Sequence, residues 1–209
     1  MSTKRIVVGL DAGGSNTHLF AECEGWSERI DRYGAATNLQ QMGVDESART
    51  LATLVREVLL SHHPISRLSI CAGVAGAGYS EVQEALADRL HRALTDDADN
   101  IHVEVVHDAC IALEAAFGSG SGLVIITGTG SIVLARTEEG TTCRAGGWGY
   151  RLGDAGSGYA VGQAGLRAVA AAFDGGPDTS LCARVDEQCG IDGRKALIRR
   201  VYQEKCAFP

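Results

Sequence analysis

The sequence predicts an α/β protein built from two related lobes. Near the N-terminus, two strands around a Gly-rich turn are followed by alternating strands and helices, a pattern typical of α/β folds. A second strand–turn–strand unit, LVIITGTGSIVLAR, resembles the first, VVGLDAGGSNTHLF. Because a repeated unit indicates related halves, we expect two lobes, residues 1–118 and 119–209, that meet at a cleft.

In the first lobe, apolar runs of β type alternate with segments of helical periodicity. Two strands flank the first turn and read as a hairpin, with a third strand possible after them. Apolar residues at helical spacing predict amphipathic helices, and Asp108 is expected at the N-cap of the last one. The expected strands are 6–10, 17–23, 68–75 and 102–106, and the expected helices are 44–60, 80–94 and 110–117.

The second lobe is expected to begin after a Gly-rich hinge at 118–122. No apolar run of β type then follows residue 145, so this lobe has no counterpart to the later strands of the first. The expected strands are 123–126, 132–136 and 142–145, and the expected helices are 159–173, 179–189 and 194–204.

Composition excludes several classes of function. The net charge is −7 and only three lysines occur, which argues against nucleic-acid binding. Seven scattered cysteines without a CxxC pair indicate reduced thiols in a cytoplasmic protein. The first apolar stretch, Ile6–Leu10, is too short for a signal peptide, and no later stretch is long enough to span a membrane.

The first Gly-rich turn, DAGGSNT, places a carboxylate at the end of a buried strand. Backbone N–H groups at Gly13 and Gly14 can reach phosphate oxygens, and the hydroxyls of Ser15 and Thr17 can donate as well. Asp11 is then placed to hold Mg²⁺ through water. A plain hairpin turn would use the same residue types, so an ordinary turn and a phosphate-binding turn both stay open.

The second turn, TGTGS at 127–131, again joins two apolar strands. Its N–H groups and hydroxyls offer a second phosphate site, and one nucleotide could contact both turns. The Walker pattern GxxxxGK[ST] is absent from the sequence, so phosphate binding would depend on backbone N–H groups and metal.

Asp108 follows the strand that ends near Val106. A carboxylate at the carboxyl end of such a strand faces the crevice where α/β folds bind ligands, and it could accept a proton from an attacking hydroxyl. The alternative is a simple helix cap that contributes about 1 kcal/mol.

A fourth motif, GGWGY followed by GDAGSG, has the character of a sugar pocket. The Trp148 ring offers an apolar face, the Asp154 carboxylate can accept bonds from vicinal hydroxyls, and the glycines allow close approach. The alternative is a structural turn with a core tryptophan.

Together these motifs resemble the N-acetylglucosamine kinase group of the BadF/BadG/BcrA/BcrD ATPase family, in the actin–hexokinase superfamily. GLDAGGSNTH and TGTGS are similar to its two phosphate motifs, HDA to its catalytic-aspartate segment and GAATN to a sugar-contacting segment. AGGWGYRLGDAGSGY is the most specific match, although Ala155 stands where members commonly have Glu. The likeness runs from Ile6 to about Phe173.

The resemblance implies a ribonuclease H-like actin/hexokinase fold, with two lobes around a nucleotide cleft and a truncated second lobe, since family members continue further. It implies an amino-sugar kinase that uses ATP and Mg²⁺, phosphorylates the 6-hydroxyl of N-acetylglucosamine or glucosamine, and has Asp108 as its base. By this likeness the nucleotide would contact Asp11, Gly13, Gly14, Ser15, Thr17, Gly128, Thr129 and Gly130. The sugar would contact Asn38, Asp108, Gly147, Trp148 and Asp154, and Asp11 would hold Mg²⁺ through water.

Two other functions stay open. The same family contains ATP-driven activators of dehydratases, which need cysteines that bridge an iron–sulfur cluster, and the scattered cysteines here favour the kinase. A non-catalytic sugar-binding regulator is the other alternative, and the presence of both Asp11 and Asp108 argues against it. We expect an amino sugar and ATP as ligands and neither nucleic acid nor membrane as partner, with a homodimer left open.

Overall fold

The computed structural model describes residues 4–25, 29–60 and 64–203. The chain divides into two compact units. One comprises Met1–Val124 with Glu138–Gly140, and the other comprises Ile125–Thr137 with Thr141–Pro209. Gly118, the last residue of the expected first lobe, is the C-cap of a helix and has a φ of 56°.

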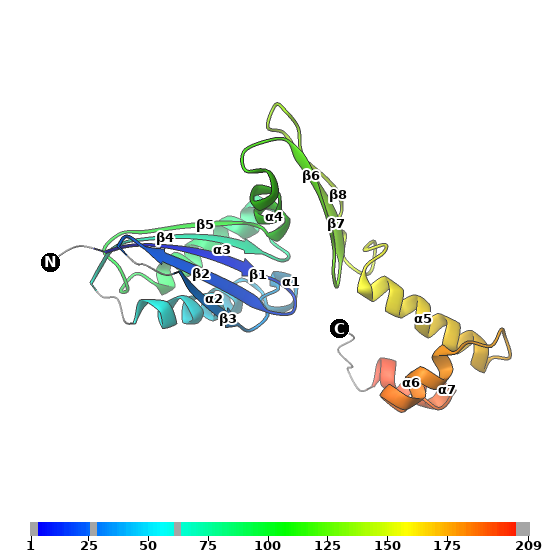
Figure 1. Cartoon of the computed structure of the whole chain (residues 1–209). Coiled ribbons are helices and arrows are strands. Elements are labelled where there is room, and N and C mark those ends of the chain that lie inside the picture. Colours follow the sequence, from blue (N-terminus) through cyan, green and yellow to red (C-terminus); the bar gives the residue numbers. More distant parts are fainter. Residues whose placement is uncertain (1–3, 26–28, 61–63, 204–209) are drawn as a thin grey trace. The chain divides into compact units, whose positions relative to one another are not determined.

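The first unit is built on a five-stranded sheet with the order β3-β2-β1-β4-β5 (Figure 1). Neighbours in β3-β2-β1 are antiparallel, whereas β4 and β5 continue in parallel from β1. This confirms the expected hairpin followed by βαβ units, and it includes the third strand. The strands are β1 (Lys4–Ala12), β2 (Thr17–Cys23), β3 (Ile30–Gly34), β4 (Ile65–Val74) and β5 (Ile101–His107).

One face of this sheet carries the main core. Alternate β1 side chains at Ile6, Val8 and Leu10 are buried, as the period of a strand requires when one face is covered. The cover is supplied by α2 (Val44–Leu59) and α3 (Ser80–Ala93), which pack side by side and follow the short α1 (Leu39–Met42). Both long helices were expected from their apolar spacing.

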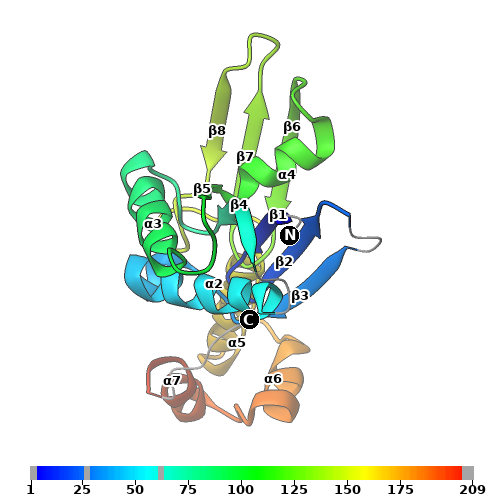
Figure 2. The ribbon, with the colours of Figure 1, turned by 90° about the vertical axis from the view of Figure 1, so that its left-hand side faces the viewer.

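The opposite face of the sheet is contacted by α4 (Asp108–Phe117), as the end-on view of the strands in Figure 2 shows. Gly73 on β4 makes this approach possible, because a Cβ there would lie 2.6 Å from Cδ1 of Ile111. Because α4 directly follows β5, its N-terminus lies at the carboxyl end of the parallel strands, and the packing of Ile111 on Gly73 keeps the helix against this face.

The second unit combines most of a three-stranded sheet, in the order β6-β7-β8, with three helices, and the first three residues of β6 belong to the first unit. The elements are β6 (Gly122–Thr127), β7 (Ser131–Arg136), β8 (Thr142–Gly146), α5 (Gly158–Phe173), α6 (Leu181–Cys189) and α7 (Arg194–Tyr202). Val169, Ile191 and Leu197 form the core of the helical part. The strands and helices agree with those expected, except that the last helix ends at Tyr202, and residue 204 lies outside the described residues.

Candidate functional site

The first Gly-rich turn joins β1 to β2 at the carboxyl end of β1. The N–H of Gly13 donates to the carbonyl of Asn16 at 2.9 Å and closes the turn. Gly14 and Ser15 are exposed, so this part of the turn is accessible to a ligand. Small side chains and exposed backbone are the features that an anion-binding turn needs.

Thr17, at the start of β2, is buried in the structure. Its hydroxyl donates to the carbonyl of Ala35 at 2.7 Å and lies 3.0 Å from the hydroxyl of Thr37. The N–H of Thr37 in turn donates to the carbonyl of Gly13 at 3.0 Å. Thr17, which the sequence predicted to contact phosphate, here joins the turn to the segment that precedes α1.

Asn38 lies beside this turn. Its Oδ1 accepts the N–H of Gln40 at 2.9 Å, which makes Asn38 the N-cap of α1. A Cβ on Gly76 would lie 3.2 Å from Oδ1, and a Cβ on Gly14 would lie 3.8 Å from Nδ2. The amide nitrogen of Asn38 therefore neighbours the exposed part of the turn.

Asp108, the predicted base, and Asp11, the predicted magnesium ligand, share one edge of the first sheet. Asp11 lies one residue before the end of β1, and Asp108 directly follows β5. The strands end level with one another, because Ala12 pairs with Val74 of β4 and Val74 pairs with His107 of β5. This is the edge at which open α/β sheets bind ligands.

The electrostatics of Asp11 reflect this placement. Burial raises the pKa of the Asp11 carboxyl above 3.8, and the negative charge of Asp108 raises it further. His18, which pairs with Asp11 across β1 and β2, acts in the opposite direction. The two carboxylates are thus close enough to repel one another, an arrangement that a bound cation would relieve.

Asp108 begins α4 but does not cap it, so the expected N-cap position was wrong by one residue. The cap is His107, because β5 extends through this residue and its Nδ1 accepts the N–H of Ala109 at 3.1 Å. Oδ1 of Asp108 accepts the same N–H at 2.8 Å and lies 2.7 Å from Nδ1 of His107. The Asp108 side chain is 30% exposed, so the carboxylate stays accessible.

In the second unit, the TGTGS turn connects β6 to β7. Within this turn, the N–H of Gly128 donates a hydrogen bond of 2.9 Å to the carbonyl of Gly130. Asp154, expected to contact sugar, is only 8% exposed, and its Oδ1 accepts the N–H of Ser131 at 3.2 Å. The structure therefore brings Asp154 to the second turn.

Gly147 and Trp148 follow β8 in the same unit. Gly147 has a φ of 68°, and a Cβ there would lie 2.8 Å from Cδ1 of Ile132, so only glycine fits well. Trp148 is 62% exposed, which excludes the alternative of a core tryptophan. The guanidinium of Arg144 lies 5.5 Å from the centre of the Trp148 ring.

The structure thus gathers the expected residues in two groups. In the first unit, Asp11, Gly13, Gly14, Asn38 and Asp108 lie around the carboxyl ends of β1 and β5. In the second unit, the residues of the turn at 127–131 lie next to Gly147 and Asp154. Sequence reasoning missed His107 as a neighbour of the Asp108 carboxylate, although a histidine directly before that aspartate was the available signal.

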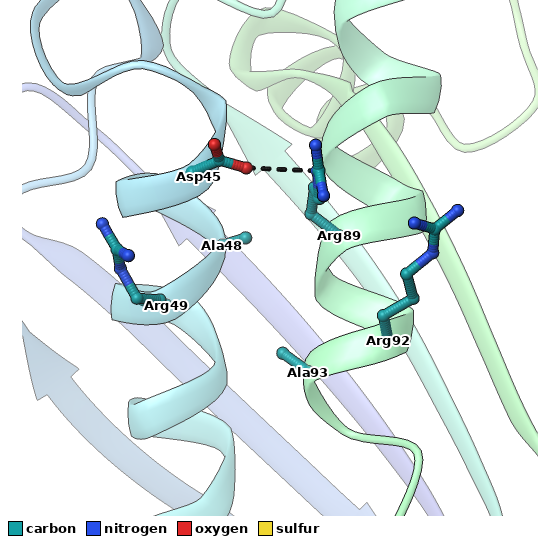
Figure 3. Close-up of a pocket in the computed structure, with 6 residues that line it drawn as sticks. All are labelled: Asp45, Ala48, Arg49, Arg89, Arg92 and Ala93. Atoms are coloured by element: carbon teal, nitrogen blue, oxygen red, sulfur yellow. Dashed lines mark ion pairs between the residues drawn. The ribbon is translucent and has the colours of Figure 1, made fainter.

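A separate groove lies between α2 and α3, away from these motifs (Figure 3). It is lined by Asp45, Ala48, Arg49, Arg89, Arg92 and Ala93. Arg89 pairs with Asp45 at 3.1 Å, and Arg92 pairs with Asp88 at 2.8 Å. Because these acids offset two of the three guanidinium charges, the groove has weak attraction for an anion.

The described residues contain neither a metal-type cluster nor a membrane-spanning helix. In residues 4–25, 29–60 and 64–203, no group of three or more His, Cys, Asp or Glu side chains has the arrangement of a metal site. Within the same ranges, none of the helices combines the length and the apolar character that crossing a membrane requires.

Comparisons with known proteins agree on one family. Residues 8–197 match the sequence profile of the BadF/BadG/BcrA/BcrD ATPase family. The chain is 32% identical over 202 residues to N-acetylmuramic acid/N-acetylglucosamine kinase of Clostridium acetobutylicum, with 95% of the chain covered. It is 31% identical over 214 residues to N-acetyl-D-glucosamine kinase of Dictyostelium discoideum, with 97% covered. The resemblance drawn from the motifs is therefore confirmed.

Solved structures point to the same fold. A candidate N-acetylglucosamine kinase from Chromobacterium violaceum has a TM-score of 0.73 and 25% identity, with 93% of this chain and 67% of that chain covered. The expected sugar-kinase type of α/β fold is thus confirmed. The chain spans 65% and 66% of the lengths of the two curated relatives.

Proposed function

We propose, because this chain belongs to the BadF/BadG/BcrA/BcrD ATPase family, that it is an ATP-dependent amino-sugar kinase. Its acceptor would be the 6-hydroxyl of N-acetylglucosamine or glucosamine. The names of the two curated relatives support the sugar class. The observation that carries the proposal is the placement of Asp11 and Asp108 at the same edge of the sheet, beside an exposed Gly-rich turn.

Asp108 acts as the general base in this proposal. The carboxylate takes the proton of the sugar hydroxyl as that oxygen forms a bond to the γ-phosphorus and the bond to the ADP oxygen breaks. The hydrogen bond from the N–H of Ala109 to Oδ1 holds the carboxylate in one orientation at the start of α4. A fixed base of this kind lowers the barrier because it needs little reorganisation during the reaction.

The backbone supplies most of the phosphate binding. The N–H of Gly14 and the Ser15 hydroxyl would bind phosphate oxygens in the first unit, and the N–H groups of Thr129 and Gly130 would do so in the second. Such N–H groups stabilise charge without a lysine, in agreement with the missing Walker pattern. The N–H groups of Gly13 and Gly128, which the sequence also predicted to contact phosphate, instead close their own turns by donating to Asn16 and Gly130. Thr17 contributes indirectly, because its hydroxyl bonds with Ala35 and Thr37 keep the first turn in place.

The first unit also fits a magnesium ion. Asp11 and Asp108 are two mutually repelling carboxylates with access to solvent, and Mg²⁺ prefers oxygen ligands while it keeps much of its water shell. Asp11 would hold the ion, through water, at the end of β1. When bound, Mg²⁺ neutralises charge on the phosphates.

Sugar binding would use side chains that the structure leaves accessible. The Trp148 ring is exposed and can cover an apolar sugar face, and Gly147 allows close approach of the backbone. In the first unit, Asn38 presents its amide nitrogen beside Gly14 and can donate to a sugar hydroxyl.

The test is a panel of acceptors. N-acetylglucosamine, glucosamine, N-acetylmannosamine and glucose are each incubated with the chain, ATP and Mg²⁺, and ADP release is followed together with ³¹P NMR of the product. We expect the amino sugars to give a 6-phosphate monoester. ATP hydrolysis that no sugar stimulates, or binding of sugar without turnover, would refute the kinase and favour the activator or the regulator respectively.

A further inference from the structure

Asp154 has an unusual backbone and environment. Among the described residues, only Asp154 and several glycines have a positive φ, and its value is 62°. A non-glycine residue in this region is strained, and such strain persists only where surrounding contacts hold it. The side chain is also ionisable and almost fully buried, so it needs hydrogen-bonding partners within the protein.

Those partners belong to the second Gly-rich turn. Oδ1 of Asp154 accepts the N–H of Ser131 at 3.2 Å. Oδ2 lies against Gly130, where an added Cβ would be 3.0 Å from this oxygen. The carboxylate therefore contacts the last two residues of the turn, and Gly130 is the residue type that lets it approach.

Further hydrogen bonds join the segment 154–158 to the same turn. The hydroxyl of Ser131 donates to the carbonyl of Ala155 at 2.9 Å, and the N–H of Gly158 donates to the carbonyl of Gly128 at 2.8 Å. The segment is itself closed by a bond of 3.0 Å from the N–H of Ser157 to the carbonyl of Asp154. Both ends of the turn are thus hydrogen-bonded to the segment 154–158, which leads into α5.

We propose that Asp154 is a positioning residue: its side chain holds the turn at 127–131 in the conformation that binds the phosphates of the nucleotide. This inference rests on the proposed kinase function. Glycines lose more conformational freedom than other residues when they are ordered, so a Gly-Thr-Gly turn binds a ligand weakly unless other contacts order it beforehand. The Asp154 bond to Ser131 orders the turn at the point where β7 begins.

Two substitutions separate the hydrogen bond from the backbone strain. Asp154→Asn retains an oxygen acceptor, and asparagine tolerates positive φ. Asp154→Gly relieves the strain but removes the acceptor. Asp174→Gly is a matched control, because Asp174 is an exposed residue of the same unit that follows α5 and pairs with Arg194.

The measurement is calorimetric binding of a non-hydrolysable ATP analogue with Mg²⁺, without sugar, to the full chain. We expect Asp154→Asn to bind within about threefold of the unaltered chain, and Asp154→Gly to bind about tenfold more weakly, as the loss of one such hydrogen bond predicts. The control should bind normally. Equal affinities in all variants, or an equal loss in Asn and Gly, would overturn the role of Asp154.

Amide hydrogen exchange tests the same contact even if a variant does not fold. In the unaltered chain, the Ser131 N–H should exchange more slowly than that of Thr129, the central residue of the turn, and unprotected Ser131 would also overturn the inference. Failure of the unaltered chain to bind the analogue would instead refute the proposed kinase. The two failures are therefore distinguishable.

Discussion

Replacement of Asp108 with asparagine removes a proton acceptor and leaves the shape of the side chain almost unchanged. Oδ1 of Asp108 accepts the N–H of Ala109 at 2.8 Å, and an asparagine oxygen can accept the same bond. A negative charge at a helix N-terminus contributes about 0.3–1 kcal/mol, so the free energy of unfolding should change by no more than this amount. The fold and the N-terminus of α4 should persist.

Turnover of the Asp108→Asn variant should nevertheless fall strongly. A positioned base typically contributes about 10²–10⁴ in rate, which corresponds to about 2.7–5.5 kcal/mol of activation free energy. The assay measures kcat from ADP release at saturating ATP and sugar, and Tm is measured on the same samples. Asp88→Asn is the control, because Asp88 is an exposed partner of Arg92 on α3 and should leave kcat unchanged.

Asp108→Ala completes the comparison. It removes the bond to Ala109 as well, so stability should fall by about 0.5–1.5 kcal/mol while kcat falls as in the asparagine variant. An asparagine variant with turnover near that of the unaltered chain would refute the reasoning. Asp108 would then serve only the start of α4, and the base would lie elsewhere.

Asp11→Asn should weaken use of Mg·ATP much more than sugar binding, and calorimetry that finds the reverse would contradict the metal assignment. It should also raise Tm at neutral pH, because burial and Asp108 raise the pKa of Asp11 in the folded state. Ionised Asp11 therefore costs stability above its folded pKa, and the gain should vanish as the pH falls below the ordinary value of 3.8. Gly73→Ala should destabilise the chain by about 1–3 kcal/mol, because the new Cβ would lie 2.6 Å from Ile111, and Ile111→Ala in the same chain should restore part of the loss. Denaturant unfolding of the two single variants and the double variant measures this coupling, and strictly additive losses would contradict it. Trp148→Ala should raise the sugar KM about tenfold or more with little change in Tm, because the ring is exposed; unchanged sugar kinetics would remove Trp148 from the pocket.

Much of the fold was predictable because its elements carry local signals. The alternation of buried residues along β1 and the apolar stripe of α2 can each be identified from a few neighbouring residues. β3 gave a weaker signal, since Ile30–Gly34 is a short edge strand with mostly exposed side chains. The start of α4 was misplaced by one residue, because His107 and Asp108 both suit a helix start and their side-chain geometry decides between them.

The candidate site was predictable in residue type but not in the use of each residue. Asp11, Asp108 and the two Gly-rich turns were identifiable because each combines a strand end with small or acidic residues. The burial of Thr17 and its hydrogen bonds to Ala35 and Thr37 could not be predicted from neighbouring residues, because these bonds link β2 to a loop 18 and 20 residues away.

The sequence by itself determined the family, the order of the elements and the residue types available for chemistry, because these follow from local periodicity and motif spacing. The tertiary structure alone decided which groups are accessible and which already have partners. It brought Asp11 within electrostatic range of Asp108, and it buried Asp154 against a turn 23 residues earlier in the chain. Such relations depend on where separate strands end and how closely their loops pack, so they arise only when distant segments of the folded chain meet.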